Sequence, residues 1–171
     1  MWQFTGKHRP SFADKTEAGQ ESVWDYPRPP VCLPDPRRIV VKSNQRLIAD
    51  TRSAVRVLET ASPPTVYIPA DDVDLSVLRK MSGSSYCEWK GPATYWSLDD
   101  GHQQIKNVGW SYENPTKTFR EMTGFLSFYP ALVTCTIDEE IVQPQAGGFY
   151  GGWVTKEIVG PWKGPPGTGG W

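Results

Sequence analysis

The sequence contains few of the residues that form metal centres and disulfide frameworks. Its 171 residues include three cysteines and two histidines, and no pair of cysteines has the C-x-x-C spacing of a zinc site. Three widely spaced cysteines do not form a disulfide framework either. We therefore expect no metal and no cofactor.

Long apolar runs and an excess of positive charge are also missing. The first nine residues include no apolar stretch typical of a signal peptide, and no later run approaches the roughly 20 apolar residues that span a bilayer. With 18 Lys and Arg against 19 Asp and Glu, the formal net charge is -1, whereas nucleic-acid binding requires a basic surface. These features predict a cytoplasmic protein without a membrane or nucleic-acid partner.

Turn-forming residues and aromatic rings are abundant instead. The chain has 16 prolines, 16 glycines, eight tryptophans and seven tyrosines. The prolines and glycines favour turns over helices, and tryptophan in such numbers is typical of sheet cores and aromatic-lined pockets. A length of 171 residues fits one domain.

Changes in composition divide the chain into three segments. We expect residues 1–37 to form an extended N-terminal arm, residues 38–142 a core β domain, and residues 143–171 a Gly/Pro/Trp-rich segment that wraps around the core. In the arm, the prolines of Trp24–Pro30 impose an extended path, and the two aromatic residues of this stretch are expected to attach it to the domain.

Short alternating apolar stretches between turn signals predict a mostly β core. The expected strands cover residues 38–42, 46–50, 54–60, 65–68, 104–112, 124–129, 132–137 and 140–142, and turn residues make the first two a hairpin. The composition of 54–60 also fits a helix, but β-branched Val55 and Val57 at a spacing of two favour a strand. One helical turn is expected within 70–78, with Asp71 or Asp72 as its N-cap.

Residues 84–96 carry the densest chemistry of the chain. These thirteen residues include a thiol, a carboxylate, an ammonium group and four aromatic rings, in an order that no helical stripe explains. The pattern indicates a turn that enters a strand, with side chains alternating between two faces. Such a segment either lines a ligand site or is an aromatic core strand.

Three residues of this segment are candidates for catalysis: Cys87, Glu88 and Lys90. A nucleophilic thiol needs a nearby cation, but in a strand Lys90 would point away from Cys87 unless a turn intervenes. The alternative for Cys87 is a buried, inert thiol. By alternation Glu88 and Lys90 share a face, where they form either an acid–base pair or an exposed ion pair.

The aromatic residues exceed the needs of a core, so some of them are expected to line a cleft. An apolar pocket with a few convergent polar groups is the usual form of a small-molecule site. The residues predicted to bind the ligand are Glu59, Tyr67, Lys90, Tyr95, Trp110 and Tyr112. Glu59 would need a partner at a half-buried position, and Lys90 or a tyrosine hydroxyl is a candidate.

Several short motifs stand in a specific order through the middle of the chain. They are Ile48-Ala49-Asp50-Thr51, Pro64-Thr65-Val66-Tyr67-Ile68-Pro69, Tyr86-Cys87-Glu88-Trp89-Lys90-Gly91, Trp110-Ser111-Tyr112 and Phe128-Tyr129-Pro130. On these motifs, residues 38–142 resemble the domain of unknown function 427 family, which is also catalogued as nucleotidyltransferase-like. The flanking segments resemble a longer subgroup with N- and C-terminal extensions.

The resemblance implies a fold but little chemistry. It implies a mainly β protein: a single small domain of bent, tent-like antiparallel sheets, with at most one or two short helical turns and extended arms at both ends. Similar sheets occur in zinc-binding guanine-exchange-factor-like and methionine-sulfoxide-reductase-like proteins, whose two C-x-x-C pairs are missing here. No glycine-rich phosphate loop between a strand and a helix supports the nucleotidyltransferase label.

Three functions fit these features. The expected one is a non-catalytic module that binds an unidentified small molecule in an aromatic-lined cleft. One alternative is an enzyme that uses Cys87, or Glu88 with Lys90, and a reactive thiol would favour it. The other is a protein that docks a partner chain through its Trp/Pro-rich arms.

Overall fold

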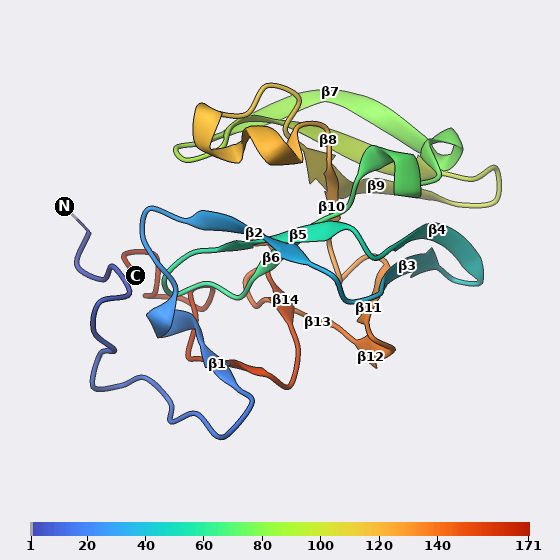
Figure 1. Ribbon diagram of the computed structural model, residues 1–171. Coiled ribbons are helices and arrows are strands. Elements are labelled where there is room, and N and C mark those ends of the chain that lie inside the picture. The colour runs from blue at the N-terminus through green and yellow to red at the C-terminus, as the bar shows by residue number, and fades with distance from the viewer. Residues whose placement is uncertain (1) are drawn as a thin grey trace.

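The computed structural model, which describes residues 2–171, has a mainly β fold of small, mostly antiparallel sheets (Figure 1). The sheets form two layers, one above the other in Figure 1, and the terminal segments lie below them. The helical elements in this range are short 3-10 turns. No helix among residues 2–171 is long and apolar enough to cross a membrane. The predicted fold class is confirmed.

The upper layer is one four-stranded sheet. Its strands are β7 (Leu78–Cys87), β8 (Gly91–Asp99), β9 (Gln104–Ser111) and β10 (Leu126–Phe128). Each is antiparallel to its neighbour, in the order β10-β9-β8-β7. The register shifts within β7 and again within β8, and such irregularities bend a sheet.

The lower layer consists of two sheets. One contains β3 (Ile39–Ser43), β4 (Arg46–Thr51), β11 (Thr134–Ile137) and β12 (Glu140–Ile141), in the order β12-β11-β3-β4. The other contains β2 (Val31–Asp35), β5 (Ala54–Leu58) and β6 (Thr65–Tyr67), in the order β2-β5-β6. The predicted hairpin of β3 and β4 and the strand character of 54–58 are confirmed.

Alternating side chains of the lower strands fill the space between the layers. In β3, Ile39 and Val41 are fully buried, whereas Lys42 is exposed. They belong to a large aliphatic cluster that also contains Ile68 and Phe128, both fully buried. A β-bridge between Ile68 and Leu126 joins the two layers beside this cluster.

The two terminal segments lie side by side below the sheets (Figure 1). β1 (Glu21–Ser22) pairs in parallel with β15 (Ile158–Val159), while β13 (Gln143–Pro144) pairs with β14 (Trp153–Val154). Trp24, in the 3-10 turn η1 (Val23–Asp25), is fully buried. Its ring packs against the rings of Phe4, Phe12 and Trp171 at centroid distances of 5.1, 5.2 and 5.4 Å.

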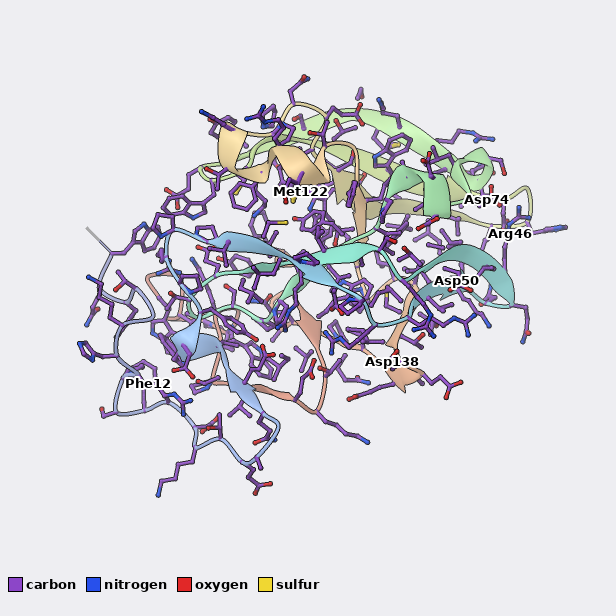
Figure 2. All side chains as sticks on the ribbon, viewed as in Figure 1. Phe12, Arg46, Asp50, Asp74, Met122 and Asp138 are labelled. Carbon is purple, nitrogen blue, oxygen red and sulfur yellow. The ribbon has the colours of Figure 1, made fainter. Side chains whose placement is uncertain are left out.

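The helical turn expected within 70–78 differs from the prediction. Two 3-10 turns occur there, η2 (Ala70–Asp72) and η3 (Leu75–Val77), and extended Val73 separates them because it forms a β-bridge to Ala49. Neither Asp71 nor Asp72 caps a helix, so that prediction was wrong. Asp74 caps η3 by accepting from the Ser76 amide at 3.1 Å, and at the edge of the molecule it also pairs with Arg46 at 3.0 Å (Figure 2).

The segment 84–96 is a hairpin and not a turn that enters a strand. β7 ends at Cys87, residues 88–90 form the turn, and β8 starts at Gly91. The alternation that placed Glu88 and Lys90 on one face therefore does not apply. Strand β7 was not predicted, because most of its side chains are exposed and its sequence therefore does not alternate between apolar and polar residues. A further 3-10 turn, η4 (Lys117–Met122), follows β9.

Candidate functional site

A cavity of about 250 Å³ lies beside the β7–β8 hairpin and is bordered by the C-terminal segment. The hairpin and the lower sheet provide much of its wall, and residues from 145 to 163 provide the rest. Its lining comprises Val57, Glu59, Ser62, Pro63, Thr65, Tyr67, Ser85, Tyr86, Cys87, Lys90, Ala93, Tyr95, Trp110, Tyr112, Tyr129, Gln145, Phe149, Tyr150, Gly151, Gly152 and Lys163.

The structure brings all the residues predicted to bind a ligand to this one cavity. They are Glu59, Tyr67, Lys90, Tyr95, Trp110 and Tyr112. Of the catalytic candidates, Cys87 and Lys90 both line the cavity, because the turn at 88–90 reverses the chain between them. Glu88 is exposed in that turn and is not part of the lining.

Local strand geometry explains how the aromatic wall forms. Tyr95 on β8 and Trp110 on β9 are direct cross-strand partners, so their side chains project from the same face of the upper sheet. Tyr112 follows Trp110 at a spacing of two and lines the same cavity. Tyr67 reaches the wall from β6 in the other layer.

Trp110 lies at the centre of this wall. Its indole Nε1 donates a hydrogen bond to the Tyr67 hydroxyl at 3.2 Å, and the two rings meet edge to face at a centroid distance of 6.1 Å. The centroid of the Tyr129 ring is 4.5 Å from that of the Trp110 ring. Met122, the last residue of η4, is fully buried and belongs to the same cluster (Figure 2).

Burial raises the pKa of three tyrosine hydroxyls that line the cavity. Desolvation raises the pKa of Tyr67 and of Tyr112 far above the ordinary value, and it raises the pKa of Tyr129 to about 12. Because the Tyr67 oxygen accepts from Trp110, its own proton is available to a further acceptor. Tyr95 on β8 and Ser85 on β7 share another hydrogen bond, of 2.7 Å, across the hairpin.

Glu59 has a different partner from the one that its sequence suggested. The Trp89 indole donates to Oε1 of Glu59 at 3.2 Å, and Nε of Arg28 is 3.4 Å from the same oxygen without hydrogen-bond geometry. The Arg28 side chain is only 1% exposed and also donates to the carbonyl oxygen of Thr60 at 2.8 Å. The expectation that Lys90 or a tyrosine hydroxyl would pair with Glu59 was therefore wrong.

The two lysines of the cavity lie over aromatic rings. Nζ of Lys90 is 5.7 Å from the centroid of Tyr112, and Nζ of Lys163 is 5.5 Å from that of Tyr150. Both side chains are half-buried. Among the ion pairs of residues 2–171, none includes either ammonium group.

The C-terminal segment approaches the cavity closely at two glycines, Gly151 and Gly152. A Cβ on Gly151 would lie 2.0 Å from Cη2 of Trp110, and one on Gly152 would lie 2.3 Å from Oε1 of Gln145. Gln145 accepts from the Gly152 amide at 3.1 Å and donates to the carbonyl oxygen of Lys163. This segment was missed as part of the site, and the only signal for it was the Gly-flanked Phe149-Tyr150 pair.

The three free cysteines differ in their surroundings. Burial raises the pKa of Cys135 well above its ordinary value and raises that of Cys32 to about 11. Those two thiols stay protonated at neutral pH, and Cys87 is the cysteine that lines the cavity. Residues 2–171 contain no group of three or more His, Cys, Asp or Glu that could hold a metal ion.

Comparison with known proteins identifies the core but not the chemistry. No curated protein matches the chain. Residues 31–142, more than half of its length, match the family described as Domain of unknown function (DUF427). The matched residues include the hairpin and the aromatic wall, whereas Gln145, Gly151 and Lys163 lie beyond them. The predicted resemblance is confirmed, and the chain belongs to this family, with additional residues on both sides of the matched region.

Proposed function

We propose that the chain is a non-catalytic module that binds a small molecule in the aromatic cavity. The observation that carries the proposal is the convergence of residues distant in sequence, including Glu59, Trp110 and Lys163, on one concave surface. Aromatic walls with a few polar groups are typical of small-molecule sites. A volume of about 250 Å³ is smaller than the roughly 300–1,000 Å³ of sites for drug-sized molecules, so a compact ligand fits best.

A thermal-shift screen of the full chain tests the proposal, with metabolites, nucleotides and metals in the presence and absence of a chelator. A ligand at 100 times its Kd stabilises the folded state by about 2.7 kcal/mol. For a domain of this size, that corresponds to a rise in melting temperature of roughly 5–10 °C. A screen in which no compound raises the melting temperature with concentration would contradict the proposal.

Trp110 and Trp96 form a matched pair for assigning a hit to the cavity. Both lie on the upper sheet, but Trp96 does not line the cavity and donates its indole proton to Ser111 at 2.9 Å. Trp110→Phe removes the indole that holds Tyr67 and should weaken ligand binding about tenfold, as expected for a lost hydrogen bond near a polar ligand group. In isothermal titration calorimetry, Trp96→Phe should bind the ligand with an affinity close to that of the parent protein.

Catalysis at Cys87 is a second candidate, favoured by the presence of Cys87 and Lys90 on one cavity wall. A catalytic thiol reacts as the thiolate, so iodoacetamide should alkylate Cys87 rapidly at pH 7 if this alternative holds. Cys32, whose pKa is raised to about 11, is the internal control for an unactivated thiol. Equal, slow alkylation of Cys87 and Cys32, measured by mass spectrometry, would leave the binding module as the better explanation.

A role for the arms in partner binding receives less support. The arm rings of Phe4, Trp24 and Trp171 pack mainly against one another. These packed rings stabilise the fold, whereas the exposed rings of the terminal segments are those of Trp2, Phe12 and Phe149. A cytoplasmic location remains part of the proposal, because three free cysteines suit a reducing compartment.

A further inference from the structure

We infer that the ligand of this cavity is a small planar organic anion, an aromatic carboxylate or phosphomonoester, whose charge lies between Lys90 and Lys163. The inference rests on the proposed function and adds the chemical class of the ligand. It follows from the charges of the lining, from the available hydrogen-bond donors and from the shape of the aromatic wall.

The charge of the lining is positive and unbalanced. Glu59, Lys90 and Lys163 are its charged residues. The negative charge of Glu59 is offset by Arg28 at 3.4 Å, outside the lining. Within residues 2–171, no carboxylate lies within 4 Å of either lysine Nζ. The two ammonium groups therefore lack an anion, and a ligand can provide it.

The nearby aromatic rings do not replace that anion. Lys90 lies 5.7 Å from Tyr112 and 5.9 Å from Phe119, while Lys163 lies 5.5 Å from Tyr150. Such cation–π contacts contribute about 0.5–2 kcal/mol, but they leave the positive charge uncompensated. A half-buried ammonium group interacts more strongly with an anion than an exposed one, because solvent screens it less.

Lys90 belongs to the family-matched region, and Lys163 comes from the C-terminal segment. The backbone carbonyl of Lys163 accepts a hydrogen bond from Gln145, which holds this part of the segment beside the cavity. The site thus combines one cation from each of two separate chain regions. The two cations would orient the charged group of a ligand, while the rest of the ligand contacts the aromatic wall.

The polar and aromatic parts of the wall suit the remainder of such a ligand. The Tyr67 hydroxyl accepts from Trp110, so it retains a proton to donate to an acceptor. The rings of Tyr95, Tyr129 and Tyr150 are half-buried and line the cavity, where a flat ring can stack on them. The volume of about 250 Å³ favours a ligand with one or two rings.

Matched pairs of probes test the inference by isothermal titration calorimetry on the full chain. The pairs are benzoate with benzamide and indole-3-acetate with indole-3-acetamide, which differ in charge but hardly in shape. Phenyl phosphate is the third anion and distinguishes a phosphomonoester from a carboxylate preference. We expect at least one anion to bind about tenfold or more tightly than its neutral counterpart, with an affinity that falls as salt increases.

Three lysine variants test which lysines contact the negative charge of the ligand. Lys90→Met and Lys163→Met keep the length of the side chain but remove the cation, and each should reduce the preference for the anion about fivefold to tenfold. Lys80→Met is the control, because Lys80 lies 5.2 Å over Trp96 and outside the cavity. Circular dichroism checks folding, and Lys90→Gln and Lys163→Gln repeat the test if a Met variant unfolds.

Each outcome decides a different question. Equal binding of the acid and the amide at the cavity would overturn the anion inference and leave the proposed function intact. An anion preference that survives both lysine substitutions would also overturn it. If neither the probes nor any compound of the thermal-shift screen binds, the proposed function fails as well.

Discussion

The two hydrophobic clusters on either side of β6 are both well buried but differ in composition. The cluster between the layers, here the inter-sheet core, is mostly aliphatic and includes Ile39, Val41, Ile48, Leu98 and Phe128. The other, here the aromatic cluster, lies beside the cavity and includes Tyr67, Trp110, Tyr112, Phe119 and Met122. The inter-sheet core has few polar atoms, whereas the aromatic cluster includes residues with hydroxyl and indole groups that line the cavity.

Strand β6 separates the two clusters. Val66 and Ile68 belong to the inter-sheet core, and Tyr67 between them belongs to the aromatic cluster. One short stretch of extended chain therefore contributes to both packing and the site. Burial alone therefore does not distinguish a structural residue from a residue of the site, because Tyr67 is as buried as its neighbours and still lines the cavity.

The largest expected effect comes from a cavity in the inter-sheet core. Phe128 is fully buried, and Phe128→Ala should lower the free energy of unfolding by about 3–5 kcal/mol. Urea denaturation measures this loss. The fraction that remains folded should keep its ligand affinity, because Phe128 does not line the cavity. A large loss of affinity without a loss of stability would break the distinction between the clusters.

A smaller effect is expected where the C-terminal segment contacts the aromatic cluster. In Gly151→Ala the new Cβ would lie 2.0 Å from the Trp110 ring, so the segment must move away. We expect about 1–3 kcal/mol of destabilisation in thermal unfolding, and weaker ligand binding. Gly83→Ala is the control, because a Cβ at Gly83 meets no atom within 4 Å. An unchanged affinity in Gly151→Ala would remove this segment from the site.

The smallest effect is a contribution of the Tyr129 hydroxyl, which packs against the aromatic cluster, to the dependence of stability on alkaline pH. Burial raises the pKa of Tyr129 to about 12, whereas an unfolded tyrosine titrates near pH 10. The stability that this group contributes is therefore complete below pH 10 and is lost as the pH rises toward 12. Melting temperatures between pH 8 and 12 should decline less steeply in Tyr129→Phe than in the parent protein.

Tyr86→Phe is the matched control for that experiment, because Tyr86 is 76% exposed and also lines the cavity. Its alkaline profile should follow that of the parent protein. Identical profiles for Tyr129→Phe and Tyr86→Phe would show that the Tyr129 hydroxyl is not protected by folding. Phe128→Ala should shift the whole profile downward without changing its shape.

The sequence predicted elements whose side chains alternate between burial and exposure. The β3–β4 hairpin was predictable because apolar Ile39 and Val41 alternate before a turn that contains Asn44. β7 was not, because most of its residues face solvent. The cap of η3 was misplaced because the bridge between Ala49 and Val73, which interrupts the helical turn, is a long-range contact.

The same limit applies to the site. Six residues of the cavity were predictable because the aromatic residues of the chain exceed what a core needs and a few charged residues stand among them. The partner of Glu59 was not, because Arg28 reaches it from the N-terminal arm. The contribution of Lys163 and Gly151 depends on where the C-terminal segment lies, and no local pattern encodes that position.

The pairing of β1 with β15 also determines when the N-terminal arm can complete its packing during synthesis. Glu21 pairs with Ile158, so the N-terminal arm leaves the ribosome long before its partner strand exists. The Trp24 ring, fully buried in the folded protein, lacks its contact with Trp171 during that interval. The closing of the arms is therefore a late, long-range step of folding, and it is completed only after the aromatic wall of the cavity has been synthesised.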